Sequence, residues 1–132
     1  AMEMCARSVI LSAGLVSLMA DDNYNCALAH AVCYGLQHFE HVEREYLHGD
    51  LVAYGALVQL AVDGQLDKAR ELRAFLVSLG TPVTLAQMHV PLEKTALHDA
   101  LIEATTGPDM AHIPYPVTQD MVFDAMQRVE TL

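Results

Sequence analysis

Apolar residues recur along this chain at the three- and four-residue spacing of an α-helix, and no stretch shows the strict alternation of a β-strand. The least polar stretch is 51–62, where only Gly55 and Gln59 interrupt the apolar side chains. A helix without a wide polar face must be surrounded by other helices. We therefore predict a central helix over residues 48–62, with Asp50 in its first turn and His48 at its start.

Further helices are expected around this central one. Residues 3–20 are apolar nearly all round and carry an i,i+4 pair of Glu3 and Arg7. Thr118 is a good N-cap for the last helix, in which Met121 and Met126 are expected to be core residues. The remaining predicted helices lie at residues 24–36, 67–79 and 93–105, and a short element is expected to start at Thr81 and run towards Met88. Residues 37–47 are expected to form an exposed connector with room for a helical turn, and residues 109–117 an extended loop.

The stretch 67–79 has the clearest amphipathic pattern in the chain. We predict that Asp67 caps it and that Gly80, followed by Pro82, ends it. One face is expected to pack inward and the other to face solvent. The inward residues would be Leu72, Phe75, Leu76 and Leu79, and the outward ones Lys68, Arg70, Glu71 and Arg73.

These patterns predict an all-α fold, a helical bundle of about five or six helices. The 132 residues suit a single domain spanning 1–132. No internal repeat and no low-complexity segment interrupts it.

Charge and composition narrow the function. The net charge of −10, from 7 basic and 17 acidic residues, argues against a nucleic-acid partner. The longest apolar run is broken by polar residues and is shorter than the roughly 20 residues of a membrane span, so no membrane partner is expected. With no signal-peptide pattern and three cysteines that cannot all pair, we expect a cytoplasmic protein.

Candidate chemistry centres on two histidines and a cysteine. His30 and Cys33 share a helix face at i,i+3, and His48 follows 18 residues after His30, so a helix–loop–helix can bring the three together. Imidazole and thiolate are good ligands for zinc or another divalent metal. The alternative is that they are ordinary polar residues at helix ends. The acidic, histidine-rich connector at residues 38–45 is expected to be a solvated loop.

Two runs of residues carry a family resemblance. The runs 27–36, Ala-Leu-Ala-His-Ala-Val-Cys-Tyr-Gly-Leu, and 46–60, which begins Tyr-Leu-His-Gly-Asp-Leu, resemble the C-terminal metal-binding domain of the glycerol dehydrogenase family. The similarity continues through residues 79–85 and the tail at 112–118. This family lies within the iron-containing, or type III, alcohol dehydrogenases.

The resemblance implies a metal site at His30 and His48. In such enzymes an aspartate and two histidines hold a metal, usually zinc, that polarises the substrate hydroxyl for hydride transfer to NAD. The aspartate and the NAD-binding domain are expected to have no counterpart in these residues. Cys33 is a candidate third ligand in place of the aspartate. Relatives typically have His-Asn where this chain has Cys33 and Tyr34, which puts substrate handling in doubt.

Two interpretations follow. In the first, the chain is the C-terminal domain of a metal- and NAD-dependent polyol or hydroxy-acid oxidoreductase, which would meet its substrate only together with a nucleotide-binding domain. In the second, it is a free-standing, non-catalytic helical protein of the same ancestry. Neither interpretation assigns a catalytic or NAD-binding residue here, because no glycine-rich strand-to-helix turn occurs among the 7 glycines. In both, the apolar surface of the first and central helices predicts self-association. A low zinc affinity is also expected in both, because the two histidines lack the aspartate ligand.

Overall fold

The computed structural model describes residues 2–7, 11, 14–19 and 26–132, and in these residues the protein is helical without a β-strand. The predicted all-α fold is confirmed. No helix in this part of the chain has both the length and the apolar character needed to cross a membrane. The elements are α1 (Met2–Arg7), α2 (Gly14–Met19), α3 (Leu28–Leu36), α4 (Glu40–Glu45), α5 (His48–Val62), α6 (Leu66–Leu79), α7 (His98–Thr106), the 3₁₀ helix η3 (Pro108–Met110) and α8 (Gln119–Glu130).

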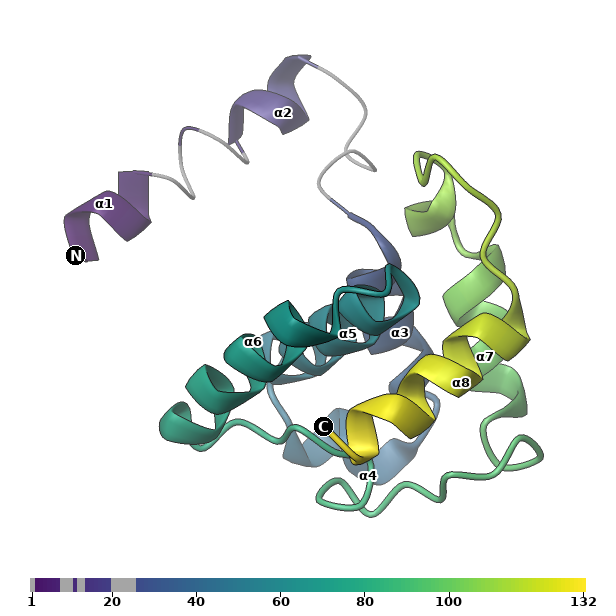
Figure 1. Cartoon of the computed structure of the whole chain (residues 1–132). Helices are drawn as coiled ribbons and strands as arrows, with labels where there is room; N and C mark the ends of the chain where they lie inside the picture. The colour runs from purple at the N-terminus through teal and green to yellow at the C-terminus, as the bar shows by residue number, and fades with distance from the viewer. Residues whose placement is uncertain (1, 8–10, 12–13, 20–25) are drawn as a thin grey trace.

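Helix α5 is the centre of the packed body, as predicted. It contacts α3, α6 and α8, and Figure 1 shows α6 on one side of it and α7 with α8 on the other. Six of its residues are buried, and no residue from Leu51 to its end is fully exposed. Every residue of this stretch is therefore at least partly covered, in keeping with the lack of a wide polar face.

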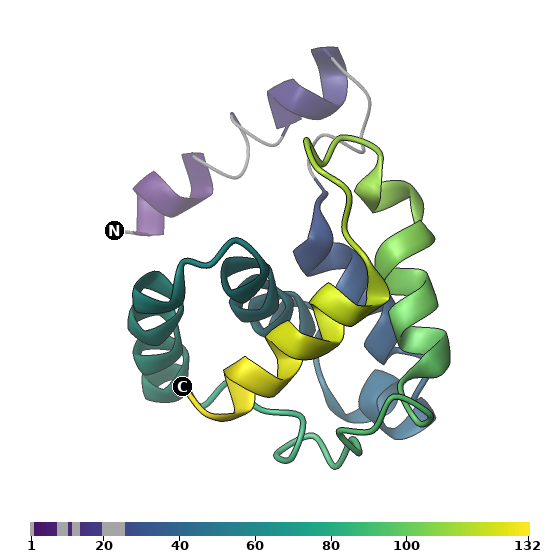
Figure 2. The same ribbon diagram turned by 45° about the vertical axis from the view of Figure 1, so that its right-hand side comes forward.

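Glycines set the closeness of the helix pairs around α3. A Cβ on Gly55 of α5 would lie 2.2 Å from the carbonyl oxygen of Ala29, and one on Gly35 of α3 would lie 2.4 Å from that of Ala100 in α7. Only glycine permits such an approach of two helix backbones. Helix α3 is thus held between α5 and α7, and α8 crosses over the same group (Figure 2).

The N-terminal prediction was only partly right. The Glu3–Arg7 ion pair forms at 2.7 Å, but α1 has no buried residue and Leu15, Leu18 and Met19 of α2 are exposed. Both helices stand apart from the packed body (Figures 1 and 2). Residues 8–10, 12–13 and 20–25, which include other parts of the first two predicted helices, lie outside the described residues.

Helix α6 differs from its prediction in its N-cap and in the residues that it buries. Gln65 is its N-cap, so Asp67 lies in the first turn, where it suits the helix dipole and pairs with Arg70 at 2.8 Å. Gly80 ends the helix in the left-handed conformation as predicted. Phe75 and Leu79, predicted to face inward, are 59% and 62% exposed because no described element covers that side of the helix.

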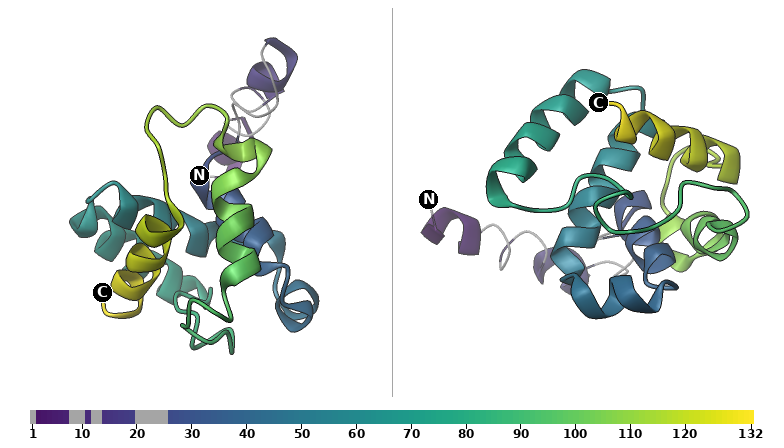
Figure 3. Two further views of the ribbon diagram at one scale, coloured as in Figure 1. Left: turned by 90° about the vertical axis from the view of Figure 1, so that its right-hand side faces the viewer. Right: turned by 90° about the horizontal axis from the view of Figure 1, so that it is seen from below.

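The C-terminal third follows the predictions with shifted boundaries. Helix α7 begins at His98 rather than near Glu93, because residues 94–97 form turns before regular helix is reached. Thr118 caps α8 by accepting a hydrogen bond from the Met121 nitrogen at 3.2 Å, as predicted. Met126 is buried in the core, whereas Met121 is 37% exposed. Both views of Figure 3 show α8 packed against the rest of the bundle.

Candidate functional site

The candidate site lies where the start of α5 passes over α3. Helix α5 runs antiparallel to α3, since His48 at its start reaches Cys33 while Gly55 and Gln59 reach Ala29. The side-chain oxygen of Gln59 accepts a hydrogen bond from the Ala29 nitrogen at 3.1 Å and so satisfies one free N–H at the start of α3. This pairing fixes the register that places His48 over His30, Cys33 and Tyr34.

The three predicted residues do meet. The ring centroids of His30 and His48 are 5.7 Å apart, and Cys33 Sγ lies 3.4 Å from His48 Nδ1 and 3.8 Å from the His48 carbonyl oxygen. Tyr34 adds a fourth side chain, with its ring centroid 5.8 Å from that of His48. His48 is exposed and His30 half-buried, so the imidazoles remain accessible while Cys33 is buried beneath them.

The Cys33 thiol is protonated at neutral pH in this environment. Burial, together with the negative charge of Asp109, raises its pKa to about 11. The neutral thiol is a weak donor, within reach of both His48 Nδ1 and the His48 carbonyl oxygen. Binding a metal at Cys33 would therefore require loss of a tightly held proton.

Asp109 is the residue that the sequence interpretation missed. It was placed in an extended loop, but Pro108 to Met110 form the 3₁₀ helix η3, which packs against α3. Asp109 is 6% exposed and is the one buried charged residue of the described chain. An aspartate after Gly107-Pro108 normally indicates an exposed turn, so no local signal in the sequence marked it.

These side chains fit a divalent ion by chemistry and only in part by geometry. Two imidazoles converge and a thiol lies beside them, which is the donor set that zinc prefers. Across the part of the chain that the structure describes, however, no group of three or more His, Cys, Asp or Glu side chains is arranged to hold a metal ion. Cys33 as a third direct ligand therefore stays a prediction.

The connector holds a short helix, as the sequence allowed, and is less solvated than the loop we predicted at residues 38–45. Its α4 helix buries Val42, and His41 Nε2 lies 3.0 Å from the Met88 carbonyl oxygen. Because the side chain of His41 bonds to a backbone carbonyl in the segment between α6 and α7, it holds α4 against the packed body. The connector has a packing role and brings no further histidine to His48.

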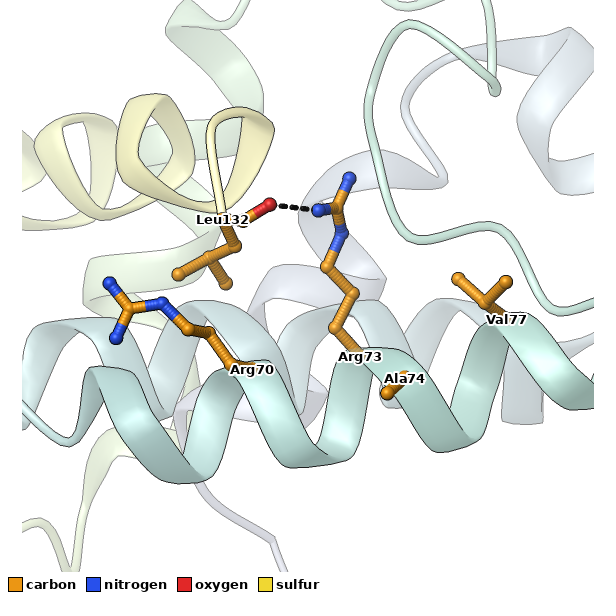
Figure 4. A pocket seen from close by; sticks show the side chains of 5 residues that line it. All are labelled: Arg70, Arg73, Ala74, Val77 and Leu132. Atoms are coloured by element: carbon orange, nitrogen blue, oxygen red, sulfur yellow. Dashed lines mark hydrogen bonds between the residues drawn. The ribbon is translucent and has the colours of Figure 1, made fainter.

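A cavity lies away from these histidines. It has a volume of about 470 Å³ and is lined by Arg70, Arg73, Ala74, Val77 and Leu132 (Figure 4). Arg73, predicted to face solvent, is half-buried and donates a hydrogen bond to the Leu132 carbonyl oxygen. This hydrogen bond joins Leu132 to α6. None of the side chains around His48 lines the cavity.

Over most of its length the chain is similar in sequence to known oxidoreductases. It is 34% identical over 126 residues to hydroxycarboxylate dehydrogenase A of Escherichia coli (strain K12), covering 94% of this chain and 34% of that enzyme. It is 31% identical over 121 residues to glycerol dehydrogenase of Thermotoga maritima, covering 88% of this chain and 32% of that enzyme. Glycolaldehyde reductase of Halobacterium salinarum is 30% identical over 122 residues, covering 90% of this chain and 33% of the relative. No protein-family model matches.

The fold and these relatives define the class as a helical domain of dehydrogenase-like ancestry. The chain spans about a third of the length of the curated relatives it matches. It is homologous to the glycerol dehydrogenase family of oxidoreductases, and its all-helical fold agrees with the C-terminal helical domain that the sequence resembles.

Proposed function

We propose that this chain is the helical, metal-binding domain of a glycerol dehydrogenase-like oxidoreductase, with His30 and His48 as its metal ligands. The observation that carries the proposal is the approach of the two imidazole rings to 5.7 Å between centroids, from residues 18 apart in the sequence. A bound zinc ion would polarise an alcohol oxygen as a Lewis acid. The chain's own residues position the ion: Gly55 and Gln59 set the helix register, and Tyr34 lies beside His48 at the exposed side of the site.

We further propose that these residues alone do not oxidise polyols or hydroxy acids. Hydride transfer needs NAD and substrate held together in a reactive geometry. The described residues do not fit NAD, because they contain no strand that leads through a glycine-rich turn into a helix. The nucleotide site belongs, in this proposal, to a separate domain.

Zinc titration by calorimetry under reducing conditions tests the ligand assignment. We expect His48→Ala to weaken zinc binding at least tenfold, because it removes one of two imidazoles. His38→Ala is the matched control, since His38 is an exposed histidine of the connector. Equal affinity for wild type and His48→Ala would show that the histidine pair is not a metal site.

A third variant, Cys33→Ser, decides the role of the thiol. Weaker binding would make Cys33 a ligand, and unchanged binding would make it a packing residue beneath two histidines that bind alone. The absence of NAD-linked activity is tested by adding zinc, NAD and glycerol or a 2-hydroxy acid. Metal-dependent NADH formation, or saturable micromolar NAD binding, would refute that part of the proposal.

Exposed apolar side chains favour a second candidate function, that of a free-standing, self-associating helical module. Phe75, Val77 and Leu79 on α6 are each more than half exposed, and so are Leu15 and Leu18 on α2. Pairing two copies would remove such surface from water. Sedimentation at micromolar concentration tests this, with Phe75→Ser expected to shift the protein toward monomer. A wild-type monomer would count against the module.

A further inference from the structure

The cavity beside α6 combines cationic groups with apolar walls. Its volume of about 470 Å³ is typical of a site for a small molecule. Four of its five lining residues lie on one face of α6, at the i, i+3, i+4 and i+7 spacing, and the fifth follows α8 (Figure 4). These residues are Arg70, Arg73, Ala74, Val77 and Leu132.

The two arginines carry more N–H donors than their neighbours satisfy. Arg73 Nη1 donates to the Leu132 carbonyl oxygen, but Arg73 Nε is buried and has no hydrogen-bond partner among the described residues. Arg70 donates to the carboxylate of Asp67, which is itself exposed to solvent. Folded proteins rarely leave a buried N–H group unpaired. A ligand with strong acceptor atoms would suit the donors that remain.

Positive charge is concentrated on α6, although the chain as a whole is acidic. Lys68, Arg70 and Arg73 are three of the 7 basic residues in a protein of net charge −10. In the view of Figure 4 the guanidinium groups of Arg70 and Arg73 lie on either side of Leu132. Charges of one sign in a cleft with apolar walls raise the local potential and attract the opposite charge. The cavity is therefore suited to an anion.

The remaining lining of the cavity is apolar. Ala74, Val77 and Leu132 have no polar atom in their side chains. Val77 also lines a second cavity, of about 280 Å³, so a ligand has room to extend along α6 beyond the arginines. An aliphatic chain would gain from leaving water there, whereas a bare inorganic anion would not.

We propose that this cavity binds an amphipathic carboxylate, a small acid whose carboxylate lies against Arg70 and Arg73 and whose aliphatic chain extends toward Val77. Guanidinium groups bind carboxylates through paired, charge-assisted hydrogen bonds. Because Arg73 also holds Leu132, the ligand would strengthen the contact between α6 and the residues after α8. The site is separate from the histidines at the start of α5, so its outcome leaves the proposed metal site untouched.

Titration of the full chain with hexanoate at neutral pH, without zinc and followed by NMR, tests the proposal. We expect saturable shifts of the amide and methyl signals of Val77 and Leu132. Acetate and inorganic phosphate lack the aliphatic chain, and 1-hexanol lacks the charge. Each of these three probes should therefore bind at least about tenfold more weakly than hexanoate.

Three variants locate the binding. Arg70→Met and Arg73→Met each remove one guanidinium and should weaken hexanoate binding about tenfold, the loss typical of a hydrogen bond to a charged group. Lys68→Met is the matched control, because it removes the same charge from an exposed position of α6 outside the cavity and should bind as wild type does. Arg70→Met keeps the bond from Arg73 to Leu132, so it tests the site even if Arg73→Met does not fold.

Four results would overturn the proposal. The first is the absence of saturable shifts with hexanoate, and the second is equal affinity for hexanoate and any one of the three comparison probes. The third is unchanged hexanoate binding in Arg70→Met, or a loss in Lys68→Met as large as that in Arg70→Met. The fourth is a set of shifts at His48 in place of Val77 and Leu132, which would assign carboxylate binding to the other site.

Discussion

Helices α5 and α6 follow each other in the chain and have nearly the same length, 15 and 14 residues, yet they are buried very differently. Helix α5 lies against three other helices, buries six residues and has no exposed residue from Leu51 to its end. Helix α6 buries only Ala69 and Leu76, and leaves Phe75 and Leu79 exposed. An apolar pattern in the sequence thus indicates which face of a helix favours burial. Whether that face is buried depends on which other elements of the chain pack against it.

The largest expected effect comes from shortening one apolar side chain on each helix. Leu57→Ala on α5 removes a fully buried side chain and should lower the free energy of unfolding by about 2–5 kcal/mol. Phe75→Ala on α6 removes a side chain that is 59% exposed and should change it by less than about 1 kcal/mol. Urea denaturation of both variants provides the measurement. Similar losses would mean that α6 is covered in solution.

The glycine contact of α5 comes next in size. Gly55→Ala places a methyl group 2.2 Å from the Ala29 carbonyl oxygen and should cost about 1–3 kcal/mol as the helices move apart. Gly49→Ala in the same helix meets nothing within 4 Å and should be neutral or slightly stabilising. Denaturation curves compare the pair. An unaffected Gly55→Ala would contradict the close packing of α3 and α5.

A smaller effect is expected where α5 caps α3. Gln59→Leu keeps the side chain's bulk but leaves the Ala29 nitrogen without its acceptor, and should cost about 1 kcal/mol. The control is Gln127→Leu on α8, an exposed glutamine. Hydrogen exchange at the Ala29 amide should quicken in Gln59→Leu alone. Equal exchange rates in the two variants would mean that the Ala29 amide bonds to water rather than to Gln59 in solution.

The smallest effect concerns the tether between the end of α5 and the loop before α8. The hydrogen bond that Tyr115 donates to Asp63 is the main cause that raises the Tyr115 pKa to about 12, with burial and the Asp63 charge adding to it. Because the folded state holds this proton more tightly, the tether contributes fully below about pH 10, the ordinary tyrosine pKa, and is lost as pH rises toward about 12.

Absorbance titration of the tyrosines measures this tether. Asp63→Asn should bring the Tyr115 titration back toward its ordinary range, and Tyr115→Phe should remove that titration from the curve. Since Tyr115 is partly exposed, the accompanying change in stability should be small. A wild-type curve with no tyrosine titrating above the usual range would show that the bond does not persist in solution.

Much of the candidate site was predictable from local spacing. His30 and Cys33 had to share a face of α3 once that stretch was helical, and His48 had to begin a helix that could not stand alone. Asp109 was not predictable, because nothing local distinguishes a buried turn aspartate from an exposed one. The exposure of Phe75 was not predictable either, because its spacing along the helix matched that of a buried face.

The sequence by itself determined the helical class, the bounds of α5, the Gly80 end of α6 and the Thr118 cap of α8, because each depends on contacts within a few residues. Only the tertiary structure decided which apolar faces are covered, how closely Gly55 approaches Ala29, and that Asp109 is buried in a short helix packed against α3. Those features join residues far apart in the chain, and their energies depend on burial and distance, which local sequence patterns do not contain.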